Sequence, residues 1–466
     1  MPVVQQRPNI LLLMSDEHRA DVTGYEGNDV IRTPFLDWLA RTGVNFNNAY
    51  TPSPICIPSR QAMMSGQLPR TCGCERYGDD LPPFSMTFAK RLSQYGYETV
   101  ASGKLHHMGP DQMQGWTRRL AGDMHVASRY IDGQVEEAAK ARPTTSQVKW
   151  SDAKEIKRAG VGRGPCVDFD EHAVDSACRF IKSYFTDPYY DRASPHQPLL
   201  LKVSLLQPHY PYFTDEEKFT YYLNRVRPFE DQELFDHPFL GTRAVRVGVD
   251  VSPREIRRAT AAYYGMVETI DHHYRRIAET LEHVGQDLDD WIIIYTSDHG
   301  EMLGEHGIWE KQKFFEASAR VPLIIRYPKA FGQGRVVREN VNLCDLFATL
   351  CDLTDIPAPE GLDSRSLVPL AKGDASGWDN ETISQFRGTN LMIKWGDIKY
   401  QYYGESMPEV LFDLARDPSE SSNLIDEPRY RDLLSQFRRR RAELGFGPDA
   451  DPNYVNAGYP RTGVGY

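Results

Sequence analysis

The chain has 466 residues, of which 40% are hydrophobic and 26% charged, and this composition excludes a disordered or a fibrous protein. Its 65 acidic and 54 basic residues give a net charge of −11, which argues against nucleic acid or a long polyanion as a partner. The longest purely apolar runs have five residues, whereas a membrane-spanning helix needs about 20, so we expect no membrane segment.

Short apolar runs alternate with helical patterns along most of the chain. The runs typical of buried strands are Asn9–Met14, Tyr97–Ala101, Leu199–Leu205, Ile292–Thr296 and Pro322–Arg326. Helices are predicted between them, at Pro34–Thr42, Met86–Tyr95 and Pro253–Val284. This alternation predicts an α/β fold, with a large and mostly parallel sheet sandwiched between helices.

Two regions depart from this alternation. Residues 112–165 lack periodicity and carry many charges, which indicates a long surface insertion or lid. After about residue 372 the pattern changes to a hairpin at 391–403, a further strand at 410–414 and a helix at 427–444, followed by a coil tail. We therefore predict a large domain over residues 1–372 and a smaller C-terminal α+β subdomain over 373–466.

The N-terminus and the cysteines indicate the compartment. The first residues lack the basic head, apolar stretch and cleavage site of a signal peptide. Seven scattered cysteines do not form the pattern of a disulfide framework, and the close pair Cys72 and Cys74 has no second pair to complete a zinc site. We therefore expect a cytoplasmic protein.

Acidic residues directly follow two of the predicted strands. Asp16 and Glu17 come after the first strand, and Asp298 and His299 come after the strand at 292–296. Ligands bind at the carboxyl ends of the strands in such sheets, and converging carboxylates need a cation between them. Oxygen ligands suit Ca²⁺ or Mg²⁺, and a histidine moves the preference toward Mn²⁺.

The segment Cys56-Ile57-Pro58-Ser59-Arg60 precedes a predicted helix. With it the chain resembles the type I sulfatases of the alkaline-phosphatase-like superfamily, in which C-x-P-S-R is the signal for oxidising the cysteine to formylglycine. Further segments in the family's order are 7–16, 103–106, 207–211 and 297–301, followed by Lys311. The resemblance covers most of residues 7–420, and segments 103–112 and 307–322 are similar to choline sulfatases, whereas the C-terminal tail is not.

The resemblance implies an alkaline-phosphatase-like fold, with residues 1–372 as the catalytic domain. It also implies hydrolysis of a small alkyl or aryl sulfate ester to an alcohol and sulfate. Cys56 would be oxidised to formylglycine (3-oxoalanine) by a formylglycine-generating maturation machinery. The hydrate of that aldehyde has two hydroxyls, of which one attacks sulfur and the other drives the later expulsion of sulfate.

The resemblance further implies roles for individual residues. One divalent cation, Ca²⁺ or alternatively Mn²⁺, would be held by residue 56 together with Asp16, Glu17, Asp298 and His299. Glu17 departs from the family, which usually has Asp or Gln at that position, and His299 stands where many members have Asn.

The remaining implied site residues are basic. Arg60 would fix the oxidised side chain and the metal ligands. Lys104 and Lys311 match the sulfate-binding lysines, and His106 matches the base that takes a proton from the hydrate or its hemiacetal. His209, together with Lys311, would contact the substrate and protonate the departing alcohol.

Other functions remain alternatives. A phosphonate monoester or phosphodiester hydrolase uses the same formylglycine with an Asp-His metal pair, and a phosphodiester carries one negative charge just as a sulfate monoester does. A metal-stabilised binding protein with an unoxidised Cys56 is a non-enzymatic alternative, and a homo-oligomer is compatible with the sequence. Two roles are open for a set of aromatic residues. They could line a pocket for a ring or a quaternary ammonium, or they could take part in ordinary packing; they are Trp116, Tyr210, Tyr212, Trp309, Tyr402 and Tyr403.

Overall fold

The computed structural model describes residues 7–123, 152–186, 196–230 and 232–449. Its centre is an eight-stranded sheet with the order β12-β2-β11-β9-β1-β7-β4-β5. The strands are β1 (Asn9–Asp16), β2 (Val44–Phe46), β4 (Glu98–Gly103), β5 (Arg118–Arg119), β7 (Leu199–Pro208), β9 (Trp291–Ser297), β11 (Leu323–Arg326) and β12 (Arg335–Val337). Neighbours pair in parallel except for β11, which runs antiparallel to both β9 and β2. The predicted α/β fold with a mostly parallel sheet is confirmed.

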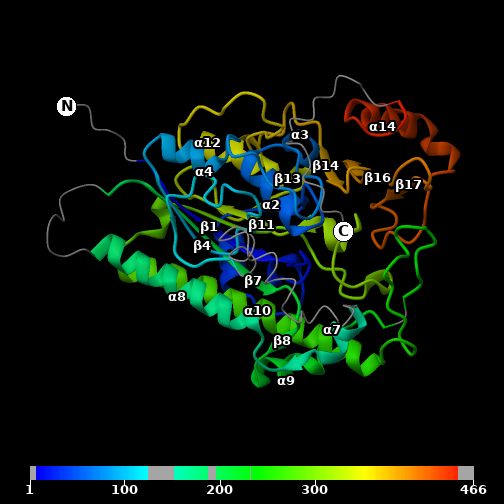
Figure 1. The fold of residues 1–466 in the computed structure, drawn as a ribbon, viewed down its shortest axis with the longest axis horizontal. Helices are drawn as coiled ribbons and strands as arrows, with labels where there is room; N and C mark the ends of the chain where they lie inside the picture. The colour runs from blue at the N-terminus through cyan, green and yellow to red at the C-terminus, as the bar shows by residue number, and fades with distance from the viewer. Residues whose placement is uncertain (1–6, 124–151, 187–195, 231, 450–466) are drawn as a thin grey trace.

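Helices cover both faces of this sheet, as Figure 1 shows. One face packs on α1 (Pro34–Thr42), α8 (Pro165–Thr186) and α10 (Pro253–His283), and the other on α2 (Cys56–Ser65), α4 (Phe88–Gln94) and α12 (Leu346–Leu353). Alternate residues of β1 belong to the two cores, because successive side chains of a strand point to opposite faces. Leu11 and Leu13 pack with the first set of helices, whereas Ile10 and Leu12 pack with the second. Burial on both faces explains why the central strands are apolar runs rather than alternating patterns.

The C-terminal part forms a four-stranded antiparallel sheet followed by a helix. The strands, in spatial order, are β14 (Glu381–Phe386), β15 (Asn390–Trp395), β16 (Ile398–Tyr402) and β17 (Val410–Asp413), and the helix is α14 (Arg431–Glu443). The predicted hairpin corresponds to β15 and β16, whereas β14 was not predicted. Ile383 and Leu391 of this sheet belong to the same apolar core as α2 and α12, so the small sheet packs directly on the large domain. The domain boundary at residue 372 stays a prediction.

Short strands and short α-helices lie between these larger elements. The small strands are β3 (Ala49–Tyr50), β6 (Gly160–Val161), β8 (Phe213–Thr214), β10 (Arg320–Val321) and β13 (Val341–Asn342), and the short helices are α3 (Pro69–Cys72), α7 (Asp152–Arg158), α9 (Glu216–Leu223), α11 (Glu316–Ala319) and α13 (Val368–Lys372). Most of the predicted insertion (124–151) and of the predicted coil tail (450–466) lies outside the described residues.

Two findings concern the expected compartment. All seven cysteines are buried and free. Among the helices that the structure describes, none combines the length and the apolar character that crossing a membrane requires. The cytoplasmic location stays a prediction.

Candidate active site

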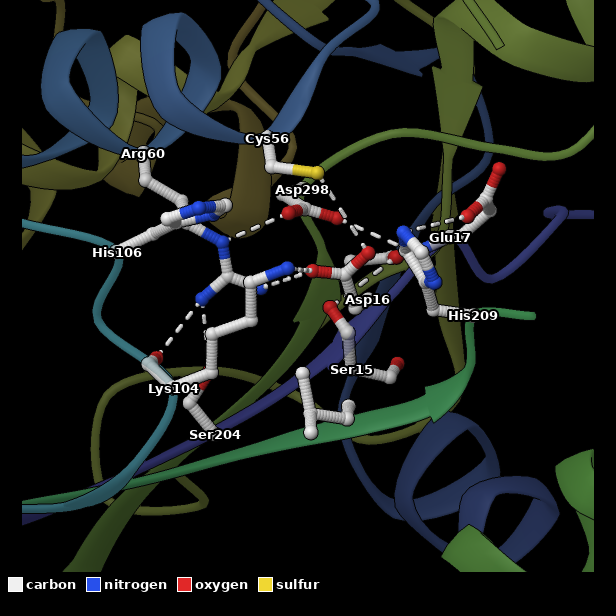
Figure 2. Close-up of polar contacts among 12 residues, drawn as sticks. Ser15, Asp16, Glu17, Cys56, Arg60, Lys104, His106, Ser204, His209 and Asp298 are labelled. Atoms are coloured by element: carbon white, nitrogen blue, oxygen red, sulfur yellow. Dashed lines mark hydrogen bonds and ion pairs between the residues drawn. The ribbon is translucent and has the colours of Figure 1, made fainter. Parts of the chain in front are cut away.

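The sequence-predicted residues meet at the carboxyl ends of four neighbouring strands. Asp16 ends β1, Asp298 directly follows β9, and Lys104 and His209 directly follow β4 and β7. Because β9, β1, β7 and β4 are adjacent and parallel, their ends lie at one edge of the sheet. Helix α2 begins over this edge at Cys56, so its first residue faces the strand ends, as Figure 2 shows.

Arg60, in the first turns of α2, donates hydrogen bonds to groups at all of these strand ends except that of His209. Its Nε donates to Asp298 Oδ2 (2.7 Å) and its Nη2 to Asp16 Oδ2 (3.0 Å). Its Nη1 donates to the Lys104 carbonyl and to Ser204 Oγ, both at 2.9 Å. The guanidinium is buried, and its fork therefore fixes both carboxylates in one geometry.

The Asp16 carboxylate is paired with two basic side chains, Arg60 and Lys104. Complete burial favours the neutral acid, but the charges of Lys104 and Arg60 outweigh it and hold the Asp16 pKa well below its usual value. Asp16 is therefore an anion that faces the Cys56 side chain.

Cys56 lies among the acidic residues and His299. Its Sγ is 3.7 Å from Asp16 Oδ1 and 3.1 Å from His299 Nε2. Burial, reinforced by the negative charge of Asp16, raises the pKa of the thiol to about 12. The unmodified side chain is therefore a neutral thiol, and a thiol is a far weaker nucleophile than a thiolate.

Four buried groups fit a divalent cation. The ligand atoms of Asp16, Cys56, Asp298 and His299 all lie within 4.8 Å of one another. The Nδ1 of His299 is 3.0 Å from the Gly300 carbonyl, so it carries the proton and the lone pair of Nε2 is directed at the cluster. Two carboxylates and an imidazole around one point are a donor set that Ca²⁺ or Mn²⁺ accepts.

Glu17 lies outside this group of four, although its carboxylate is within 4.8 Å of a ligand atom of Asp16. Its Oε2 accepts a hydrogen bond from Lys311 Nζ (2.7 Å) and lies 3.4 Å from His209 Nε2. Glu17 thus belongs to a second group of candidate ligands, with Asp16 and His209. Burial raises its pKa to about 8 in spite of the neighbouring Lys311. A role for Glu17 as a metal ligand stays a prediction.

The two predicted proton-transfer histidines lie at opposite ends of the site, as Figure 2 shows. His209 is next to Glu17, with its Nδ1 2.7 Å from the Tyr210 carbonyl. Burial and the Lys311 charge lower the pKa of His209 well below its usual value. His106 lies in the segment that leaves β4.

Most of the aromatic candidates pack in the protein interior. Trp116, Tyr212, Trp309, Tyr402 and Tyr403 are all buried. Tyr212 also donates to Glu301 Oε2 (3.0 Å), which is a structural contact. Tyr210 is only partly buried; its ring lies against His209, with the centroids 4.1 Å apart, and the Lys311 ammonium is 5.4 Å from its centroid. Tyr210 therefore contacts two of the predicted site residues, His209 and Lys311.

Ser204, which accepts a hydrogen bond from Arg60, was not predicted from the sequence. A signal existed, because Ser204 is a small polar residue within the apolar run of β7. Its partner lies 144 positions away, and no local pattern shows that pairing.

The chain matches the models of two protein families, which together cover most of its length. The Sulfatase profile matches residues 8–356, and the profile described as N-sulphoglucosamine sulphohydrolase, C-terminal, matches residues 304–445. An arylsulfatase of Clostridium perfringens is 29% identical over 97% of this chain and 98% of that protein. A choline-sulfatase of Rhizobium meliloti is 31% identical over 94% of this chain and 86% of that protein.

Solved structures share the fold. The phosphonate monoester hydrolase of Agrobacterium radiobacter superposes with a TM-score of 0.75 at 23% identity, covering 94% of this chain and 95% of that one. The corresponding enzyme of Silicibacter pomeroyi gives 0.74 at 21% identity, covering 93% and 95%.

Proposed function

Because the chain belongs to the sulfatase family and is a sulfuric ester hydrolase, we propose that it hydrolyses a small alkyl or aryl sulfate ester with a formylglycine at position 56 and one divalent cation. The observation that carries the proposal is the place of Cys56. Cys56 is the first residue of α2 and of a C-x-P-S-R segment. Its side chain lies within contact distance of Asp16 and His299. Maturation machinery that makes formylglycine is then a required partner.

Formylglycine suits this position for a chemical reason. A sulfated serine or cysteine would hydrolyse slowly, whereas the hydrate of formylglycine offers one hydroxyl to attack sulfur and a second to expel sulfate. Arg60 holds the carboxylates next to position 56, so a side chain there meets a fixed set of charges.

The cation would be held by residue 56 together with Asp16, Asp298 and His299, with Glu17 as a further candidate ligand. Such a cation supplies positive charge to the sulfate oxygens and to the attacking oxygen. Ca²⁺ is our first choice, and Mn²⁺ is the alternative that His299 favours.

The remaining groups bind the anion and move protons. Lys104 and Lys311 supply positive charge to the sulfate, where negative charge develops in the transition state. His106 accepts a proton from the hydroxyl at position 56, and His209 together with Lys311 protonates the departing alcohol.

Two measurements test this proposal. A peptide containing residue 56, from protein expressed with a formylglycine-generating enzyme, is expected to be about 18 Da lighter than the cysteine form before hydration, which reflects the change from thiol to aldehyde. Cys56→Ala is expected to abolish turnover while leaving the fold intact. An unmodified peptide in fully active protein, or an active Cys56→Ala variant, would contradict the covalent role.

Phosphonate monoester hydrolysis is the second candidate, and His299 favours it, because such enzymes have an Asp-His metal pair. 4-Nitrophenyl sulfate and 4-nitrophenyl phenylphosphonate carry the same leaving group and separate the two activities. We expect a higher kcat/KM for the sulfate. A higher kcat/KM for the phosphonate would replace the first proposal with the second.

A further inference from the structure

The backbone at His106 has an uncommon conformation that a single carboxylate holds. His106 has φ +62°, in the left-handed region that side chains other than glycine rarely adopt. The N–H groups of Leu105 and His106 both donate to Asp123 Oδ2, at 2.9 and 2.5 Å. Consecutive N–H groups around one anion form a nest, and such strained backbone persists only where the surroundings hold it. Asp123, which also pairs with Arg119, therefore fixes the segment that carries Lys104 and His106.

A second residue contacts the imidazole itself. The hydroxyl of Tyr77 is 3.4 Å from His106 Nε2, and the two rings meet edge to face with centroids 5.6 Å apart. His106 is buried, whereas 38% of Tyr77 is exposed, so the tyrosine ring lies at the solvent side of the histidine. Catalytic hydrogen bonds are often this long before a substrate binds.

The loop that carries Tyr77 is tied to the segment that carries His106. Asp80, three residues beyond Tyr77, accepts hydrogen bonds from the Gly109 N–H and from Gln114 Nε2, the latter at 2.8 Å. Both donors follow His106 on the same connection between β4 and β5. The contact between Tyr77 and His106 is therefore built into the fold before any substrate binds.

We propose that Tyr77 and Asp123 are positioning residues for His106: Asp123 fixes its backbone and the Tyr77 hydroxyl fixes its imidazole for proton transfer at position 56. This inference rests on the role proposed above for His106. A proton acceptor must be held within about 0.5 Å of its productive position, and a displacement of about 1 Å can cost on the order of 100-fold in rate. Asp123 contacts the backbone of the His106 segment and the Tyr77 hydroxyl contacts the imidazole, so we expect their loss to lower kcat rather than raise KM.

A double-mutant cycle tests the role of Tyr77. Tyr77→Phe removes only the hydroxyl, and we expect kcat to fall about tenfold with KM unchanged. In a His106→Ala background the same substitution is expected to have no further effect on kcat, because the imidazole that the hydroxyl contacts is absent. An equal loss of kcat in both backgrounds, or a change confined to KM, would overturn the inference.

Two substitutions, Asp123→Ala and Asp123→Asn, test the role of Asp123. Asp123→Ala removes the acceptor for both N–H groups and is expected to lower kcat at least about tenfold, whereas Asp123→Asn keeps an oxygen there and restores most of the activity. Phe84→Ala is the matched control, since Phe84 is 80% exposed on the same loop as Tyr77 and is expected to leave kcat, KM and Tm unchanged. Wild-type kcat in both Asp123 variants would refute its role.

The outcomes also separate this inference from the function on which it rests. If His106→Ala is strongly impaired but Tyr77→Phe and Asp123→Ala are not, only the positioning roles are wrong. If His106→Ala keeps full activity, the proposed role of His106 and the inference fail together.

Discussion

Replacing Arg60 with alanine is expected to destabilise the protein as well as inactivate it. The substitution removes four hydrogen bonds, two of them to the carboxylates of Asp16 and Asp298. Both carboxylates are fully buried, so water cannot replace the guanidinium. Lys104 remains as a partner of Asp16, whereas Asp298 loses its only salt-bridging arginine among the described residues.

The size of the effect follows from the burial of these charges. Removing one partner of a buried ion pair costs about 3–5 kcal/mol, because the remaining charge stays desolvated. With an unfolding entropy of about 2.1 cal/mol/K per residue, the chain gains about 1 kcal/mol/K on unfolding, so this loss lowers Tm by about 3–5 °C. The shift is small in degrees because the protein is large.

Thermal and urea unfolding, followed by circular dichroism, measure this shift. Arg163→Ala is the matched control, since Arg163 also binds two carboxylates, those of Asp168 and Glu171, but at an exposed site. Exposed pairs contribute little, so we expect no measurable change in Tm for the control. Equal Tm values for Arg60→Ala, Arg163→Ala and the wild type would refute the argument from burial.

Three further predictions concern the metal, the leaving group and pH. Chelation is expected to abolish turnover and lower Tm, because Asp16 and Asp298 would then repel each other, with recovery on adding Ca²⁺; an unchanged rate and Tm would exclude a bound cation. Lys311→Ala is expected to reduce kcat more for an alkyl sulfate than for 4-nitrophenyl sulfate, whose leaving group is already a stable anion; equal losses would mean that Lys311 only anchors sulfate. Burial raises the pKa of Asp271 to about 7, although the N–H groups of Phe35 and Leu36 donate to it. At pH values between the ordinary and the raised pKa of Asp271, the folded protein therefore holds a proton there that the unfolded chain has lost. As pH rises from about 4 to about 7, we expect the Tm of the wild type to fall relative to the Tm of Asp271→Asn. Parallel curves of Tm against pH for the two proteins would contradict the raised pKa.

Local sequence patterns were sufficient to predict the central fold. The apolar runs that became β1, β7 and β9 are readable because both faces of a central parallel strand are buried. Helix α10 carries its own boundary signal, since Ser252 and Glu255 form a capping box at its start. The short strands β2 and β12 were missed, because three residues are too few to show a period.

The chemical character of the site was also evident in the sequence. Each strand that ends at the site is followed directly by a polar or charged residue, and the C-x-P-S-R segment marks Cys56. Parallel strands bring their carboxyl ends together, so Asp16 and Asp298 could be paired from their positions after two strands.

Only the tertiary structure decided which side chains touch. It directed Glu17 to Lys311 rather than to the Asp298 cluster, placed Ser204 under Arg60, and set Tyr77 and Asp123 against His106. Hydrophobic periodicity records only which face of an element is buried, and it is therefore legible within a window of a few residues. These contacts join residues from 17 to 294 positions apart, and they arise from how the elements pack and how their connections run, which no short window of sequence records.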